Sequence, residues 1–254
     1  MTGVFPCIAS ANFSPGSPVI VLRGATSHAI NHVDASGNMS AALQSDPNYA
    51  QTIYVQSSPT QEPNTIVFLG NSYASLRAAS PANIRQLTGS QDAPIFEYQT
   101  HLYYIRPCSR PTGAPAAAPL CQPTDDGGHP IPTLVRQELA NQQMREIPLV
   151  EGIERLNLSY GLDVNGDDIP DQYTAAPAST DWPQVIAVRI TVLVRSTALI
   201  AGQNDSGKTY DLGGGTTFSC TAAAGDCSYL RQVYSQTVQL RNCALRRSAG
   251  GQQC

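Results

Sequence analysis

Residues 163–171, DVNGDDIPD, place oxygen-bearing side chains at alternate positions of a short acidic segment. The first, third, fifth and ninth positions are held by Asp163, Asn165, Asp167 and Asp171. Calcium takes roughly six to eight oxygen ligands, and closely spaced carboxylates and main-chain carbonyls in a tight loop supply them. The pattern predicts a calcium site made of these four side chains, with the main-chain carbonyl of Ile169 as a fifth ligand.

Two positions depart from the usual calcium loop. Asp168 stands at the sixth position, where such loops usually have glycine, and Thr174 stands at the twelfth, where they have glutamate. Aspartate can adopt the left-handed backbone conformation that glycine supplies, so the first departure is compatible with the loop. The alternative is a plain turn between a strand ending near Leu162 and one starting near Gln172, because turns favour the same residue types.

The cysteines form a second group with possible chemistry, and none of them has the short paired spacing of zinc or redox motifs. The seven are Cys7, Cys108, Cys121, Cys220, Cys227, Cys243 and Cys254. They favour disulfides in an oxidising compartment, the alternative being buried thiols in a cytosolic protein. Cys108 with Cys121 and Cys220 with Cys227 each bracket a loop, and a bridge there would contribute about 2–3 kcal/mol. Cys7 and Cys243 are further candidates, and Cys254 is the expected unpaired thiol.

No catalytic constellation stands out. Of the four histidines only His28 and His32 have a spacing suited to a metal on a helix, and their surroundings do not favour a helix. The GxSxG, GxxxxGK and GxGxxG motifs are absent, and no carboxylate pair is selected by the sequence. We therefore expect a protein that is not an enzyme.

Composition limits the class of protein further. The formal charge is −4, charged residues make up 13% of the chain, and no basic stripe is present, which argues against nucleic-acid binding. No apolar run approaches the roughly 18 residues of a membrane helix, and the first residues lack the features of a signal peptide. Since the cysteines indicate export, we expect a further N-terminal piece upstream of Met1.

The elements that must position these residues are mainly strands. Leu156, Leu158 and Tyr160 alternate with polar residues, as in a strand. Between residues 186 and 194 every even-numbered residue is an isoleucine or valine, which predicts a second strand whose apolar side is buried. Further strands are expected to begin at Val19, Thr65, Ile95, Thr133 and Tyr234. A short helix is expected over residues 80–87, and loops over 57–64, 110–130 and 211–227. Strands on both sides of residues 111–120 favour a disulfide-stapled hairpin there over an interdomain linker.

The order of these parts resembles the C-terminal block of the PilW family of type IV pilus minor pilins. LVEGIERLNLSYGLDVNGDDIPDQY, from Leu149, leads through a strand into the acidic loop, and DWPQVIAVRITVLVRS follows with Trp182 and a strand ending at Ser196. YSQTVQLRN, from Tyr234, resembles the closing strand of the family, and YYI, from Tyr103, resembles a middle strand. The strong resemblance covers about residues 145–242, and residues 243–254 form a tail beyond it.

The resemblance implies an α+β, mainly β fold: a single pilin-like head domain over residues 1–254, with antiparallel sheets and long loops. Pilins begin with an apolar helix that anchors them in the inner membrane. The resemblance implies that this chain starts just after that helix, with Gly3 and Cys7 near the start of the head. The implied role is priming of pilus assembly, with other minor pilins and a tip adhesin as partners. The implied location is the inner membrane and periplasm of a Gram-negative bacterium before assembly, and then the pilus tip at the cell surface.

Two other classes of function stay open at this point. One is a secreted adhesion module, stabilised by calcium, that binds a glycan or a host surface. The acidic loop and the disulfide-prone chain favour it. The other is a secreted hydrolase, which is supported only by the composition typical of secreted proteins.

Overall fold

A computed structural model describes residues 7–30, 44–58, 64–79, 86–88, 91–140, 142–221 and 223–240. Its strands form antiparallel sheets with few helices, so the predicted α+β, mainly β class is confirmed. Within the span predicted as one head domain, the chain forms two compact units. The first comprises Met1–Val19, Tyr104–Val135 and Pro148–Cys254, and the second comprises Ile20–Tyr103 and Arg136–Ile147.

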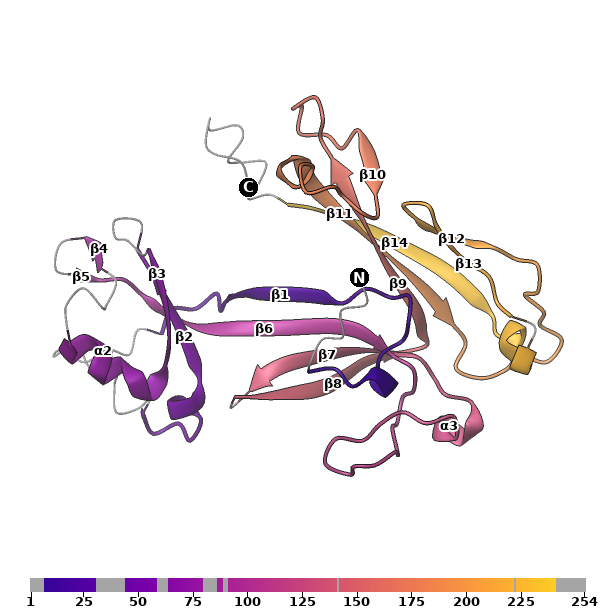
Figure 1. The fold of residues 1–254 in the computed structure, drawn as a ribbon, viewed down its shortest axis with the longest axis horizontal. Coiled ribbons are helices and arrows are strands. Elements are labelled where there is room, and N and C mark those ends of the chain that lie inside the picture. The colour runs from indigo at the N-terminus through magenta and orange to yellow at the C-terminus, as the bar shows by residue number, and fades with distance from the viewer. Residues whose placement is uncertain are drawn as a thin grey trace. The chain divides into compact units, whose positions relative to one another are not determined.

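The first unit is built on a four-stranded antiparallel sheet in the order β10-β9-β11-β14 (Figure 1). The strands are β9 (Ile153–Leu162), β10 (Gln172–Thr174), β11 (Val185–Arg195) and β14 (Arg231–Gln239). Three of the four correspond to predicted strands, and β10 begins at the residue where the sequence suggested a strand start. The register sets Tyr160 opposite Val188 and Val188 opposite Val238, so apolar residues of three strands form continuous rows.

A hairpin of β12 (Tyr210–Gly213) and β13 (Thr216–Phe218) packs on the polar side of this sheet. Asn157 Nδ2 donates to the carbonyls of Leu212 and Gly213, each at 2.9 Å. Gly213 has φ +83°, and a side chain there would meet Ser159 and Thr191. The hairpin therefore buries the polar side: Thr191 is 3% exposed.

The apolar side of β11 is less covered than predicted. Ile186 is buried, but Val188, Ile190, Val192 and Val194 are only half-buried. The prediction that this side is the buried one is therefore wrong along most of the strand, because the β12–β13 hairpin lies on the opposite side.

The remainder of the first unit holds the disulfide-stapled hairpin expected around residues 111–120. Gly113 and Leu120 exchange backbone hydrogen bonds of 2.9 and 3.1 Å, and Asn12 bonds to Pro119 and Cys121 from outside the hairpin. A short helical turn, α3 (Asp125–Gly128), follows, and the Asp125 carboxylate accepts hydrogen bonds from Thr112 and Gln122.

The second unit contains strands β1 (Ile20–Ala25), β2 (Ile53–Ser57) and β3 (Thr65–Leu69) and the first part of β6 (Ile95–Arg106). The larger sheet has the order β3-β2-β6-β7-β8, and β1 also pairs with β6. Strands β7 (Thr133–Ala140) and β8 (Gln143–Glu151) contribute residues to both units. The core of the second unit is a cluster of Tyr54, Phe68, Tyr73 and Ile95, in which the Phe68 and Tyr73 ring centroids lie 5.6 Å apart.

The predicted helix over residues 80–87 lies mostly outside the described residues. Its last two residues belong to strand β4 (Gln86–Thr88), which pairs with β5 (Gln91–Asp92), so the prediction is wrong there. The helix that forms is α2 (Tyr73–Ala79), where Tyr73 anchors the first turn in the core. The other helical turns among the described residues include η1 (Ser10–Asn12), η2 (Tyr49–Gln51), η3 (Gly70–Ser72), η5 (Trp182–Gln184) and η6 (Ala223–Ser228). None of the described helices has the length and apolar character that crossing a membrane requires.

Candidate functional site

The acidic loop of residues 163–171 joins β9 to β10 at one end of the four-stranded sheet. It starts directly after Leu162 and ends directly before Gln172, as the alternative turn interpretation also expects. The Asp171 N–H donates to the Leu162 carbonyl at 2.8 Å, which closes the loop at its base. Sheet pairing therefore fixes both ends of the loop.

Asp163 organises the interior of the loop. Its side chain is buried, and its Oδ1 accepts hydrogen bonds from the N–H groups of Gly166 at 2.6 Å and Asp167 at 3.2 Å. Its Oδ2 accepts a third from the N–H of Asp168 at 3.1 Å. Hydrogen bonds of this kind from a side chain to following amides stabilise a tight turn.

The other three predicted side-chain ligands meet one another. Asn165 Nδ2 lies 3.2 Å from Asp167 Oδ2 and 3.2 Å from Asp171 Oδ1. Asp171 also accepts a hydrogen bond from the Val164 N–H at 2.7 Å. Two carboxylates thus converge on a single neutral amide group, which supplies only partial positive charge.

Asp168 adopts the left-handed conformation that the sequence required at the sixth position, with φ 65°. Its Oδ1 is buried and has no hydrogen-bond partner among the described residues. Ile169 donates its N–H to Asp167 Oδ1 at 2.9 Å, and its side chain is 64% exposed. A buried carboxylate oxygen without a hydrogen-bond partner favours binding of a cation nearby.

The oxygen-bearing side chains of the loop are of the types that bind calcium, but their arrangement does not form a complete site. Asp167, Asp168 and Asp171 form no ion pair with any described residue. Among the described residues, however, only the group of Cys108, Cys121 and Asp125 brings three acidic or thiol ligand atoms within 4.8 Å of one another, and its two cysteines form a disulfide. The acidic loop is therefore not a preformed cage.

The two disulfides of the structure join Cys108 to Cys121 and Cys220 to Cys227, the two pairs that bracket loops in the sequence. Cys7 is half-buried near the start of the described chain. Cys243 and Cys254 lie outside the described residues, so their pairing stays a prediction.

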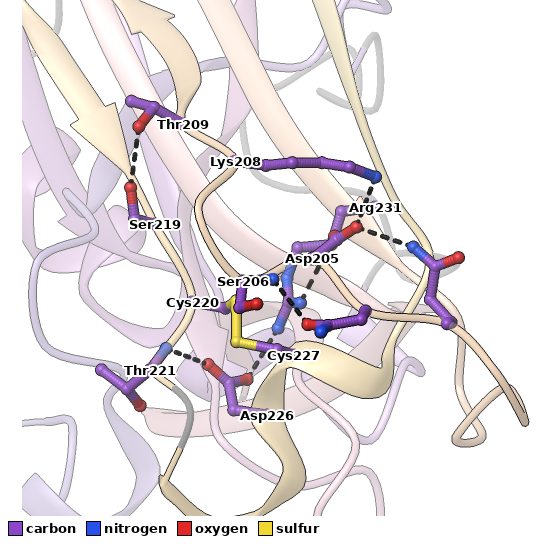
Figure 2. Close-up of a disulfide and its surroundings, with 12 residues drawn as sticks. Asp205, Ser206, Lys208, Thr209, Ser219, Cys220, Thr221, Asp226, Cys227 and Arg231 are labelled. Carbon is purple, nitrogen blue, oxygen red and sulfur yellow. Dashed lines mark hydrogen bonds and ion pairs between the residues drawn. A yellow bond between two sulfur atoms is a disulfide. The ribbon is translucent and has the colours of Figure 1, made fainter.

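The second disulfide lies beside a buried cluster of charged side chains that the sequence did not reveal (Figure 2). At its centre Arg231 donates to Glu154 at 2.6 and 3.0 Å and to Asp226 at 2.6 Å, and it lies 3.7 Å from Asp205. Arg195 lies 3.6 Å from the same Glu154. Asp226 directly precedes Cys227, so the disulfide fixes the backbone that carries one of these carboxylates.

Asp205 is fully buried and is held by hydrogen bonds from three side chains: Lys208 at 2.7 Å, Tyr210 at 2.6 Å and Gln203 at 2.7 Å. Burial alone would raise the pKa of the Asp205 carboxyl, but these hydrogen bonds outweigh burial and lower it. Burial and the bond to Asp205 raise the pKa of Tyr210 to about 12. Asp205 is therefore charged and paired at neutral pH.

One side of the sheet of the first unit carries exposed apolar side chains. We call the following side chains the apolar face: Leu158, Tyr160, Val188, Ile190, Val192, Tyr234 and Val238. Tyr234 is 53% exposed and Val238 is 46% exposed, and the rest are half-buried. Trp182, 48% exposed, packs edge-on against Tyr160 with 5.0 Å between ring centroids and extends the apolar surface. Contiguous exposed apolar side chains of this kind mark interaction sites.

Comparison with known proteins finds a family match for the part of the chain that contains this sheet. Residues 122–242 match the family described as type IV pilus-assembly protein W, PilW. We call residues 122–242 the PilW segment. The resemblance predicted from the sequence is thereby confirmed. No curated protein and no solved structure matches the chain.

The PilW segment contains the acidic loop, the second disulfide, the charged cluster around Arg231 and the apolar face. It ends after β14 and leaves out β1 to β6. PilW is a family of structural assembly proteins, so the match implies involvement in type IV pilus assembly, contact with other assembly components and a location in the cell envelope or pilus.

Sequence reasoning found the loop and the disulfide pairs but missed the charged cluster. Glu154, Arg195, Asp205 and Arg231 are far apart in the chain and share no motif. The one available signal was Arg195, which ends the apolar strand and has no nearby acidic residue in sequence.

Proposed function

We propose that this chain is the head of a minor pilin that helps to prime type IV pilus assembly, with other minor pilins and a tip adhesin as its partners. Its contribution is contact between proteins, made through the apolar face of the PilW segment. Before assembly it would be held at the inner membrane and periplasm, and afterwards at the pilus tip.

The apolar face is the observation that supports this proposal most. Its residues come from three neighbouring strands, and the register places Tyr234 opposite Val192 and Val238 opposite Val188. Since each fully buried aliphatic or aromatic side chain contributes about 1.5–3 kcal/mol, covering this face would favour association strongly. Aromatic residues such as Tyr234 and Trp182 are also typical of interface centres.

Co-purification tests this proposal. The full-length gene product would be isolated from envelope membranes with the minor pilins of the same cell, for the wild type and for Tyr234→Glu. We expect Tyr234→Glu to lower recovery of the other pilins about tenfold, because it places a charge in the contact. Val150→Glu is the matched control, since Val150 is 51% exposed and lies outside both the apolar face and the acidic loop. Equal recovery with both variants would count against the proposal.

We also propose that the acidic loop binds calcium through Asp163, Asn165, Asp167, Asp171 and the carbonyl of Ile169. The orphaned Asp168 oxygen and the convergence of Asp167 and Asp171 on one amide favour a cation there. Since the Asn165 amide nitrogen faces both carboxylates, this side chain must turn its oxygen toward the ion. A bound ion would tie the ends of β9 and β10 together. Because the cage is not preformed, we expect an affinity of roughly 10⁻⁴–10⁻³ M, as in extracellular modules.

The adhesion alternative makes a different prediction from the same sample. A calcium-stabilised adhesion module would bind an immobilised glycan panel in calcium, and would lose that binding in a chelator. The assembly proposal predicts calcium-independent recovery of other minor pilins with no glycan retained.

A further inference from the structure

The acidic loop contains the one place in the chain where asparagine is directly followed by glycine, at Asn165 and Gly166. Both residues are exposed, and Gly166 has φ +84° with no atom within 4 Å of the position that a Cβ would take. In any chain the backbone nitrogen that follows an asparagine can attack the carbonyl carbon of that side chain, and a side chain on the following residue hinders the attack. Glycine removes this hindrance. The pair is therefore open to a reaction within the chain.

A hydrogen bond of the loop holds the side-chain carbonyl of Asn165 beside the peptide group of Gly166. The Asp167 N–H donates to Asn165 Oδ1 at 3.0 Å, and this bond spans Gly166. This is the arrangement of an Asx turn, in which the side-chain carbonyl takes the place of a backbone carbonyl. The same bond places a donor on the oxygen that becomes negatively charged when Asn165 is attacked. The turn therefore orients the carbonyl and stabilises the developing charge.

A carboxylate lies at the nitrogen that would attack. The Gly166 N–H donates to Asp163 Oδ1 at 2.6 Å, and the Asp163 side chain is buried. A backbone carbonyl in this position would only hold the proton, whereas a carboxylate can accept it as the new bond forms. The N–H of Asp163 donates to the Gln184 carbonyl at 2.9 Å, which fixes the backbone that carries the carboxylate. Asp163 is thus placed as a general base.

We propose that the acidic loop converts its own Asn165 to aspartate or isoaspartate. The Gly166 nitrogen forms a bond to Asn165 Cγ, and the bond from Cγ to Nδ2 breaks. The proton of the Gly166 N–H passes to Asp163 and, through water, to the departing nitrogen, which leaves as ammonia. Water then adds to one of the two carbonyls of the cyclic imide and opens it. Water is the only co-reactant, and no other molecule is oxidised or reduced.

Conversion changes the charge of the loop. Asn165 Nδ2 lies 3.2 Å from Asp167 Oδ2 and 3.2 Å from Asp171 Oδ1. In the aspartate product a third carboxylate replaces this amide, so the loop gains one negative charge and attracts cations more strongly. This consequence for calcium rests on the calcium site proposed above, whereas the conversion itself goes beyond that proposal and needs no ion.

Asn204 provides a matched comparison within the chain. It is exposed, and its Oδ1 accepts a hydrogen bond from the Ser206 N–H at 2.9 Å, so it has the same kind of turn. The residue that follows it is Asp205 in place of glycine, and the Asp205 N–H donates to the Cys227 carbonyl at 2.8 Å. Asn204 thus has the turn without the glycine and without the base. We expect Asn204 to stay unmodified.

Peptide mapping by mass spectrometry tests the proposal. The wild-type chain would be incubated in mildly alkaline buffer with a chelator, so that no calcium occupies the loop. Replacement of the amide by a carboxylate would be followed at Asn165 and at Asn204 in the same digests. A synthetic peptide of residues 161–173, capped at both ends, gives the rate without the fold. Since a positioned base speeds proton transfer, we expect the rate at Asn165 to exceed both other rates by at least about tenfold.

A variant of Asp163 tests the base. Asp163→Asn keeps an oxygen that can accept the Gly166 N–H but cannot take its proton, and we expect the rate at Asn165 to fall at least about tenfold. Asp211→Ala is the control, because it removes an exposed carboxylate outside the loop, and it should react as the wild type does. Circular dichroism would check that both variants fold.

Two results would overturn the proposal. One is a rate at Asn165 in the wild type that is no higher than the rate of the peptide, a comparison that depends on no variant. The other is an unchanged rate at Asn165 in Asp163→Asn, which would show that the carboxylate does not act as the base.

Discussion

Arg231 on β14 donates a hydrogen bond from Nε to Oε2 of Glu154 on β9 at 2.6 Å, and both side chains are buried. Arg231 also contacts Asp226 and Asp205. Burial works against the charge on Arg231, but the bond to Glu154 and the neighbouring carboxylates outweigh it and raise the pKa of the guanidinium. One arginine thus balances carboxylates from three separate parts of the chain.

Removal of Arg231 should therefore be costly. Arg231→Met leaves Glu154, Asp205 and Asp226 without their central cation, and we expect the free energy of unfolding to fall by about 3–5 kcal/mol. Lys208→Met is the control, because Lys208 contacts Asp205 but is 54% exposed, and we expect a change below about 1 kcal/mol. Urea unfolding measures both values. Similar losses in the two variants would show that the cluster is not organised around Arg231.

The two disulfides should stabilise the fold independently. Cys108–Cys121 and Cys220–Cys227 close loops of 13 and 7 residues in separation, and each double serine variant should lose about 2–3 kcal/mol. Because the loops share no residues, the loss in the quadruple variant should be close to the sum of the two. Thermal or urea unfolding of all three variants checks this. A loss much smaller than the sum would mean that one bridge depends on the other.

Acid should weaken the first unit through Asp205. The pKa of this carboxyl is lower in the folded state than the value of about 3.9 in an unfolded chain, so the stability it contributes is present above about pH 4 and is lost as the pH falls through the folded pKa. Asp205→Asn should be less stable at neutral pH and should lose less on acidification. Urea unfolding between about pH 3 and pH 7 measures both slopes. Identical slopes would contradict a role for Asp205.

Calcium should raise the thermal stability of the wild type if the acidic loop binds it, since a ligand that binds only the folded state adds RT ln(1 + [L]/Kd). At about 10 mM calcium and a Kd near 1 mM, the gain is about 1.4 kcal/mol. Asp167→Ala should abolish the shift. Asp211→Ala, which removes an exposed carboxylate of the β12–β13 hairpin, should retain it. An unchanged melting temperature in calcium would show that the loop is a plain turn and not a calcium site.

Local patterns predicted the strands well because alternation is a property of neighbouring residues. β3, β6 and β7 begin at the predicted residues Thr65, Ile95 and Thr133, and the left-handed Asp168 follows from the turn chemistry of its loop. Strands β2, β4, β5, β8, β12 and β13 were missed. Of these, β4, β5, β12 and β13 have only two to four residues, and strands of that length hardly show a period.

Long-range packing could not be predicted from local sequence patterns. Which side of β11 is covered depends on the β12–β13 hairpin, whose bond to Asn157 spans 55 residues. Arg231 and Glu154 are 77 residues apart, and nothing near either one in sequence indicates the other. The pairing of β3 with β2 likewise depends on the order of strands in the sheet, which the sequence did not predict.

Photo-crosslinking in assembling cells tests the proposed role of the apolar face most directly. A photoreactive phenylalanine analogue would replace Tyr234 in the full-length protein and, as the control, Val164, which is 58% exposed outside that face. We predict a crosslinked product from position 234 that contains another minor pilin, and none from position 164. Equal products from both positions, or only uncrosslinked chain from position 234, would contradict assembly through the apolar face.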